Sequence, residues 1–324
     1  MISMIDLTLD VKDLRSYYFL PQGVIKAVDS VNFKIEKGKT LGIIGESGSG
    51  KSTIAWSIMR HLPHPGKIVK GEIFYKGKNI LELDMEEMRR IRWKEISMIT
   101  QSAMNALDPL MRIGNQITEA ILVHEDITKN MALKRTKKLL EEVGLKASRF
   151  VNYPHELSGG MKQRVMIAMA LACRAGLIIA DEPTTALDVI VQAQILKLLE
   201  DLRESMESSS VIFISHDLSV IVEICDKVLI MYGGKMMEYA EMQTIIKNAL
   251  HPYSRGLVNS FPRINEAEMS FESIPGSPPD MMRLPSGCVF HPRCENAKHI
   301  CREERPKIID VGNNHFVACH LIKS

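Results

Sequence analysis

The sequence predicts an α/β protein in which helices cover a parallel β-sheet, with a helical insertion and a small, loop-rich C-terminal region. Short apolar runs alternate with helical patterns along much of the chain, and a glycine-rich loop joins one such run to a helix. Prolines gather at the other end, where eight of the fourteen lie beyond residue 250. Such a region is expected to be rich in turns and held by something other than a conventional core.

The composition supports a globular chain. With 324 residues, 45% of them hydrophobic and 25% charged, the protein can bury a sizeable core. Its net charge is +2, and acidic and basic residues are interspersed, which gives no reason to expect a nucleic-acid partner. No apolar run approaches the roughly 18 residues of a spanning helix, and Asp6 and Asp10 lie where a signal peptide would be apolar. We therefore expect the chain to stay in the cytoplasm.

The order of elements follows from periodicity. The pattern turns helical from about Met85 to Leu145, where Glu86 is spaced to pair with Arg90, and we interpret this stretch as a helical insertion. Alternation of strands and helices resumes afterwards, which indicates a parallel sheet. The expected strands are 39–44, 177–180, 211–215 and 228–231, with helices beginning at Ser52 and spanning about 191–202.

The glycine-rich loop carries the first chemical signal. Gly45-Glu46-Ser47-Gly48-Ser49-Gly50-Lys51-Ser52 matches the G-x-x-x-x-G-K-[ST] pattern of a P-loop NTPase, preceded by a strand and followed by a helix. Backbone N–H groups of such a loop wrap the phosphates, and the helix N-terminus adds a favourable partial charge. Lys51 is expected to contact the β- and γ-phosphates of ATP, and the Ser52 hydroxyl to ligate Mg²⁺. The expected nucleotide-binding residues here are Gly45, Ser47, Gly48, Gly50, Lys51, Ser52 and Thr53.

A second strand ends in two carboxylates. The buried-strand pattern of residues 176–180 runs into Asp181 and Glu182, and ligands in such sheets bind outside the carboxyl ends of the strands. Asp181 can hold Mg²⁺ through water, and Glu182 can polarise the water that attacks the γ-phosphate. We therefore predict that Glu182 is catalytic.

Leu157-Ser158-Gly159-Gly160-Met161, followed by a helical pattern, resembles the signature motif of ABC ATPases. It is a second glycine-rich helix N-terminus suited to a phosphate, although the nucleotide already has one cradle. The resemblance implies an ABC-type nucleotide-binding domain that pairs head to tail with another. In that arrangement Ser158, Gly159 and Gly160 of one chain close over the γ-phosphate held by Lys51 of the other.

Other family elements follow in the expected order. The resemblance assigns Gln101 to the Q-loop, which senses Mg²⁺ and the permease, although its neighbours Thr100 and Ser102 depart from the family's usual aromatic and acidic residues. It likewise places Asp188, of Ala186-Leu187-Asp188, in the D-loop, and makes His216 the catalytic switch histidine. Tyr18 is predicted to stack on adenine, with Tyr17 as the alternative.

The C-terminal region indicates which branch of the ABC family the chain resembles. His251-Pro252-Tyr253-Ser254 and Gly287-Cys288-x-x-His291-Pro292-Arg293-Cys294 resemble the C-terminal region of ATPases from oligopeptide and dipeptide importers, a group that includes nickel and oligosaccharide importers. The resemblance implies an ABC ATPase domain over residues 1–245, with a helical subdomain at about 85–172, and a peptide-transporter-type domain over 246–324. It implies a peptide importer motor at the cytoplasmic face of the membrane. The expected partners are a second, different ATPase, two transmembrane permease subunits and, through them, an extracytoplasmic substrate-binding protein.

Four cysteines lie close together in this C-terminal region. They are separated by five, six and seventeen residues, a spacing that matches neither zinc knuckles nor the usual ferredoxin run. A bound metal could substitute for a missing hydrophobic core there. The resemblance to the dipeptide branch implies a [4Fe–4S] cluster; Zn²⁺ and free cytosolic thiols remain the alternatives. The candidate ligands are Cys288, Cys294, Cys301 and Cys319.

Two other functions compete with import. A soluble ABC ATPase acting on DNA or ribosomes would be expected to carry long coiled-coil insertions, zinc modules or a duplicated ATPase domain, and the sequence shows none of these. A P-loop kinase or GTPase leaves residues 157–161 unexplained. The sequence does not name the transported solute.

Overall fold

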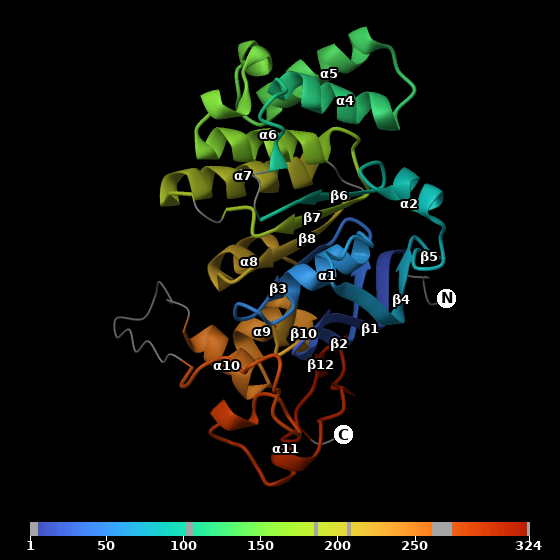
Figure 1. Ribbon diagram of the computed structural model, residues 1–324. Coiled ribbons are helices and arrows are strands. Elements are labelled where there is room, and N and C mark those ends of the chain that lie inside the picture. The colour runs from blue at the N-terminus through green and yellow to red at the C-terminus, as the bar shows by residue number, and fades with distance from the viewer. Residues whose placement is uncertain (1–5, 102–105, 185–186, 206–208, 261–273, 323–324) are drawn as a thin grey trace, which may run out of the picture. The chain divides into compact units, whose positions relative to one another are not determined.

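The computed structural model describes residues 6–101, 106–184, 187–205, 209–260 and 274–322 (Figure 1). Contacts divide the chain into two units. Unit 1 comprises Met1–Leu81 with Phe213–Ser324, and unit 2 comprises Glu82–Ile212. Unit 2 therefore interrupts unit 1 in the sequence.

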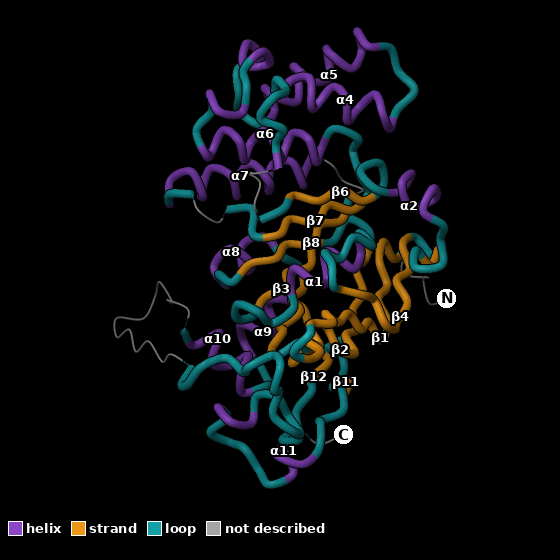
Figure 2. The backbone as a smooth tube through the Cα atoms, viewed as in Figure 1, coloured by secondary structure: helices purple, strands orange, loops and turns teal. Residues whose placement is uncertain are grey.

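Unit 1 contains an antiparallel sheet whose order is β2-β1-β4-β5 (Figure 2). Its strands are β1 (Leu7–Leu20), β2 (Gly23–Glu36), β4 (Gly66–Tyr75) and β5 (Lys78–Asn79). Apolar side chains such as Leu9, Val11 and Leu14 are buried at its centre. This sheet was not among the sequence predictions, which began at the strand before the phosphate loop.

The other strands of unit 1 surround the phosphate loop. β3 (Thr40–Ile44) runs parallel to β9 (Lys227–Tyr232), and β10 (Lys235–Glu241) returns antiparallel to β9. Every residue of β3 and β9 is buried, as expected for continuous apolar runs in a sheet covered on both faces. The helices that follow strands here are α1 (Lys51–Ile58) and α8 (Leu218–Ile224).

The C-terminal region has short elements joined by loops. These are α9 (Met242–Asn248), α10 (Pro252–Asn259), the 3-10 turn η3 (His291–Arg293), α11 (Ile300–Glu303), β11 (Ile309–Asp310) and β12 (Phe316–Val317). The region joins the rest of unit 1 because β12 pairs with β10. It also packs around the fully buried Glu238, whose carboxylate accepts hydrogen bonds from the backbone of Leu250 and His251 and contacts the His315 ring at 2.7 Å. The predicted loop-rich C-terminal region is therefore confirmed, and a buried carboxylate organises part of it.

Unit 2 is mostly helical. Its helices are α2 (Met85–Ile91), α4 (Ile113–His124), α5 (Lys129–Glu142), α6 (Gly159–Leu171) and α7 (Val189–Ser205), with 3-10 turns η1 (Ala147–Val151) and η2 (Pro154–Glu156). The predicted pair of Glu86 and Arg90 is present at 3.5 Å on α2.

Two parallel strands accompany the helices of unit 2. β6 (Ile96–Ile99) pairs with β7 (Leu177–Asp181), and β8 (Ser210–Ser215) contains residues of both units. The sequence interpretation of a helical pattern from Met85 to Leu145 was wrong at β6. That segment is only four buried residues long, three of them apolar, and its pairing with β7, some eighty residues away, decides its conformation.

Candidate functional site

The phosphate loop connects β3 to α1 in unit 1. Gly50 is the residue that precedes the helix and has a φ of 100°, and Gly48 has a φ of 76°, so both adopt the left-handed conformation that glycine favours. A Cβ at Gly50 would lie 2.0 Å from the Ala27 carbonyl oxygen, and one at Gly45 would lie 2.1 Å from that of Met231. Close backbone packing thus requires glycine at positions 45 and 50.

Lys51 folds into this loop. Its Nζ donates hydrogen bonds to the Gly45 carbonyl at 2.8 Å and to the Glu46 carbonyl at 3.0 Å, and the side chain is buried. A buried ammonium held in a glycine-rich loop is a ready positive charge for a phosphate. Ser52 and Thr53 follow it in the first turn of α1.

The two adjacent tyrosines of β1 contact different groups. The Tyr18 hydroxyl lies 3.5 Å from Thr53 Oγ1, next to the phosphate loop, and its ring lies close to Gly66. Tyr17 instead donates to Asp29 Oδ1 at 2.8 Å, and burial together with this carboxylate raises the pKa of Tyr17. Alternation of side chains along a strand explains the difference. Tyr18 is therefore the tyrosine beside the candidate site, and its stacking on adenine stays a prediction.

Two residues that sequence reasoning missed, Arg293 and Tyr253, bind the phosphate loop from the C-terminal half of the chain. Arg293 Nη1 donates to both carboxylate oxygens of Glu46, at 2.9 and 2.8 Å, and to the Tyr232 hydroxyl at 3.2 Å. The Tyr253 hydroxyl accepts a hydrogen bond from the Glu46 backbone N–H at 3.0 Å. Arg293 and Tyr253 stand inside the motifs quoted above, but no local sequence signal points from them to Glu46.

In unit 2 the structure brings together Gln101 and Glu182. The Gln101 amide Nε2 donates to Glu182 Oε2 at 2.9 Å. The contact has a simple origin, because β6 and β7 are parallel and adjacent, so the residues that follow them meet at one edge. Asp181 is buried at the end of β7, whereas Glu182 has a φ of 46°, an uncommon backbone conformation for a residue with a side chain. Such strained residues are often functional.

The signature segment begins α6. Ser158 caps this helix by accepting a hydrogen bond from the Met161 N–H at 3.4 Å, and Gly159 and Gly160 form its first turn. A Cβ on Gly160 would lie 2.7 Å from Val191 Cγ1. Asp188 in turn accepts from the Val191 N–H at 3.0 Å at the start of α7. The signature and the described part of the D-loop therefore both contact Val191. Thr185 and Ala186 lie outside the described residues.

The predicted residues are divided between the two units. The phosphate loop, Tyr18 and His216 belong to unit 1, and Gln101, Asp181, Glu182, the signature and Asp188 belong to unit 2. His216 is exposed between β8 and α8, one residue before Asp217, which caps α8 through the Ser219 N–H. Within each unit the residues lie at strand ends or helix N-termini, as a phosphate site requires.

The four C-terminal cysteines line one small cavity, together with the rings of His291 and His320. Burial raises the pKa of Cys288 to about 11 and also raises the pKa of Cys294 and Cys319, with further contributions from neighbouring cysteines. Among the described residues, no three His, Cys, Asp or Glu side chains are placed to hold a single metal ion. The structure thus gathers the predicted ligands in one place without forming a single-ion site.

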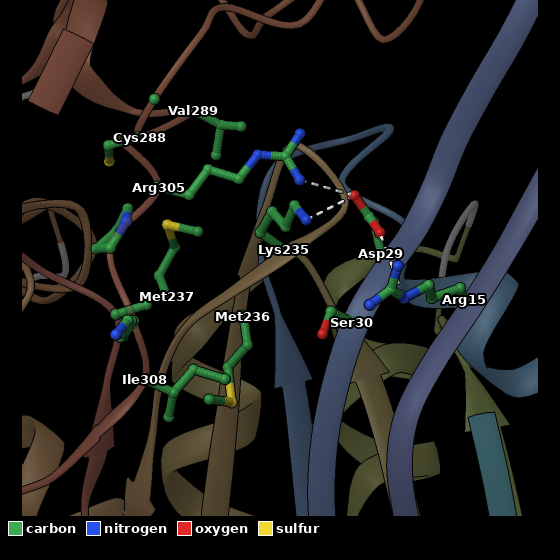
Figure 3. A pocket seen from close by; sticks show the side chains of 14 residues that line it. Arg15, Asp29, Ser30, Lys235, Met236, Met237, Cys288, Val289, Arg305 and Ile308 are labelled. Atoms are coloured by element: carbon green, nitrogen blue, oxygen red, sulfur yellow. Dashed lines mark hydrogen bonds and ion pairs between the residues drawn. The ribbon is translucent and has the colours of Figure 1, made fainter. Parts of the chain in front are cut away.

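A separate cavity of about 370 Å³ lies beside Asp29 (Figure 3). Asp29 Oδ2 accepts hydrogen bonds from Lys235 Nζ at 2.6 Å and from Arg305 Nη1 at 3.1 Å. Burial acts to raise the pKa of Asp29, but the bonds from Lys235 and Tyr17 outweigh it and the pKa is lowered. Asp29, on β2, is therefore a buried anion that binds Lys235 of β10 and Arg305 of the C-terminal region.

Comparison with known proteins agrees with these features. The model of the family "ABC transporter" matches residues 28–185, and that of "Oligopeptide/dipeptide transporter, C-terminal region" matches residues 237–301. The oligopeptide transport ATP-binding protein OppD of Escherichia coli is 46% identical over 93% of this chain and 89% of its own length. The dipeptide transport ATP-binding protein DppD of Caldanaerobacter subterraneus is 43% identical over 96% of both chains.

Solved structures show the same fold. The dimeric ATP-binding cassette MJ0796, in a post-hydrolysis state bound to ADP and Pi, superposes with a TM-score of 0.66 at 28% identity. The match covers 72% of this chain and 98% of that one. The fold, the phosphate loop and the second glycine-rich helix N-terminus define an ABC-type ATPase. At the level of sequence, the chain belongs to the family of oligopeptide and dipeptide transport ATP-binding proteins.

Proposed function

We propose that this chain binds and hydrolyses ATP to drive an ABC importer for peptides. The observation that carries the proposal is identity of more than 40% to oligopeptide and dipeptide transport ATP-binding proteins over nearly the whole chain, including the C-terminal region. Nickel and oligosaccharide remain the alternative solutes. None of the helices in the described part of the chain is long and apolar enough to cross a membrane. Because the relatives are transport ATP-binding proteins, we assign membrane passage to permease subunits, with this chain peripheral at their cytoplasmic face.

Each of the predicted site residues has a separate role in ATP hydrolysis. Lys51 and the loop N–H groups hold the phosphates. Ser52, Gln101 and, through water, Asp181 would hold Mg²⁺, which would neutralise phosphate charge. Glu182 orients the water whose oxygen attacks the γ-phosphorus while the bond from this phosphorus to the bridging oxygen of the departing ADP breaks, and His216 stabilises the charge that develops there. The observed Gln101–Glu182 hydrogen bond supports this assignment, because it ties the Q-loop residue to the proposed base.

Pairing with a second ATPase is supported by an exposed apolar surface. Val189 and Ile190 follow the D-loop Asp188 directly, and Val189 is 81% exposed. Large apolar side chains at a helix start are expected to be covered in an assembly. We assign them to the interface where Ser158, Gly159 and Gly160 reach the partner's nucleotide, and we propose a heterodimer of two ATPases.

The surface for the permease is proposed on unit 2. Leu110 is 86% exposed and lies in the segment that joins Gln101 to α4, and Val123 and Met131 are exposed on α4 and α5. The segment that carries Gln101 thus also carries an apolar side chain available to another protein. Two permease subunits, and through them a substrate-binding protein, complete the proposed importer.

The test is ATPase activity in lipid with the partner ATPase and permease, comparing the wild type with Glu182→Gln. We expect activity to require assembly and to fall by at least about a hundredfold in the variant while ATP binding persists. Glu141→Gln, on the exposed face of α5, is the matched control and should retain activity. Activity indifferent to the permease, or stimulated by DNA or ribosomes, would favour a soluble ABC ATPase. Competition for uptake among dipeptides, nickel and oligosaccharides identifies the solute.

We further propose that the four cysteines hold a [4Fe–4S] cluster. Thiolates are the usual ligands of such clusters, and a cluster spans a wider gap than one Zn²⁺ because its own irons and sulfides lie between the thiolates. The grouping of the four cysteines around one cavity supports this choice. Protein purified without oxygen should contain iron and acid-labile sulfide in equal amounts, and Cys288→Ser should lose both. Zinc alone, or no metal, would contradict the cluster.

A further inference from the structure

The side chain of Glu46 is held by the C-terminal region although Glu46 belongs to the phosphate loop. We propose that Arg293 and Tyr253 are positioning residues for the phosphate loop, so that ATP affinity depends on the folded state of the cysteine-bearing C-terminal region. Arg293 is 247 residues away in sequence, and both contacts lie inside unit 1. This inference rests on the proposed ATPase function and adds to it a control point outside the nucleotide site.

Arg293 is rigidly held at this position. Its side chain is only 7% exposed, and besides Glu46 and Tyr232 it donates to the carbonyl oxygens of Pro275 at 2.6 Å and Ile274 at 3.1 Å. Its guanidinium also lies over the Tyr232 ring, 5.7 Å from the centroid. An arginine with this many fixed contacts loses little further freedom when it binds a carboxylate. It is therefore suited to hold the loop in one conformation.

Tyr253 holds the same loop residue by its backbone. The tyrosine is fully buried in an aromatic cluster, with its ring centroid 4.7 Å from that of Tyr232 and 5.2 Å from that of Phe290. Phe290 directly precedes the turn that carries Arg293. The two contacts to Glu46 thus belong to one packed body that contains α10 and the segment between Cys288 and Cys294.

The charge of Glu46 gives these contacts a consequence for ATP. A carboxylate in a loop that binds polyphosphate is unfavourable unless it is neutralised, because like charges repel more strongly where water is partly excluded. Arg293 supplies the neutralising charge. If the C-terminal region loosens, Glu46 loses Arg293, and the loop gains a negative charge and conformational freedom together.

The experiment measures binding of a fluorescent ATP analogue to the full chain. We expect Arg293→Gln to weaken binding at least about fivefold, the lower end of usual couplings between sites. Adding Glu46→Gln to Arg293→Gln should restore much of the affinity, because the unpaired carboxylate is then gone. Tyr253→Phe should weaken binding more modestly. Arg305→Gln is the matched control, since it removes another arginine–carboxylate pair of the same region without touching the loop.

The outcomes separate the two proposals. A wild-type chain that does not bind the analogue refutes the proposed ATPase function itself. If the wild type binds and Arg293→Gln binds equally well, the positioning role is wrong. It is also wrong if the double variant is weaker than Arg293→Gln, or if Arg305→Gln loses as much affinity as Arg293→Gln, because general loosening would then explain the loss. Thermal unfolding of each variant shows whether it is folded at the assay temperature.

Discussion

Replacement of Asp29 by asparagine tests whether the buried anion in Figure 3 stabilises unit 1. The side chain of Asp29 is 4% exposed and that of Lys235 16%, so Asp29→Asn would leave the lysine ammonium buried without a counter-charge. Breaking such a pair by removing one partner costs about 3–5 kcal/mol. Deprotonating Lys235 instead would cost about 4.6 kcal/mol at pH 7, because the ordinary lysine pKa lies about 3.4 units above pH 7 and each unit corresponds to about 1.36 kcal/mol. The half-exposed Arg305 adds less than about 1 kcal/mol.

We therefore expect Asp29→Asn to lower the stability of unit 1 by at least about 3 kcal/mol, or its melting temperature by roughly 6–12 °C. Thermal and urea unfolding followed by circular dichroism measure the change. Asp6→Asn, which breaks the exposed pair with Lys37, is the control and should cost less than about 1 kcal/mol. A loss of less than about 1 kcal/mol for Asp29→Asn would show that water or a rearranged neighbour replaces the carboxylate, and would refute the assignment.

Three further predictions concern other parts of the chain. Gly45→Ala should reduce affinity for ATP more than tenfold, because its Cβ would lie 2.1 Å from a backbone oxygen; unchanged binding in an ATP titration would contradict this. Gly160→Ala should impair the ATPase activity of the assembled importer, and Val191→Ala should partly rescue it by removing the atom at 2.7 Å; failure of rescue argues against this contact. Burial lowers the pKa of His251 to about 3, with Arg255 contributing, so the folded state keeps this ring neutral while the unfolded chain takes up a proton below about pH 6.5. The free energy of unfolding should therefore decrease as the pH decreases, by about 2 kcal/mol from this residue at pH 5. Unfolding measured at pH 7 and at pH 5 should show a smaller decrease for His251→Asn than for the wild type.

Sequence patterns predicted the fold correctly in segments whose own motif and periodicity indicate the conformation. The phosphate loop is specified by glycines that the close approach of Ala27 and Met231 requires, and the adjoining strand is a continuous apolar run. The same holds for the strand that ends at Asp181 and for the helix that begins at the signature. In each of these segments, the periodicity and the motif agree on one conformation.

Long-range contacts account for what the sequence did not predict. The four buried residues of β6 fit a buried helix as well as a strand, and pairing with β7 decides between them. The hydrogen bond between Gln101 and Glu182 depends on the same pairing. Likewise, from the sequence alone Arg293 would be expected to be an exposed turn residue, because a single charged residue carries no signal of its distant partner. Only the fold places it beside Glu46.

The interruption of unit 1 by unit 2 has a consequence for synthesis. A ribosome that adds about 5–20 residues per second completes the continuous unit 2 before it makes the second half of unit 1. Arg293 follows Glu46 by 247 positions, which corresponds to a delay of about 12–50 s. The nascent chain thus carries a phosphate loop without its arginine during this interval, and the proposed dependence of ATP binding on Arg293 would withhold nucleotide until Arg293 has been made.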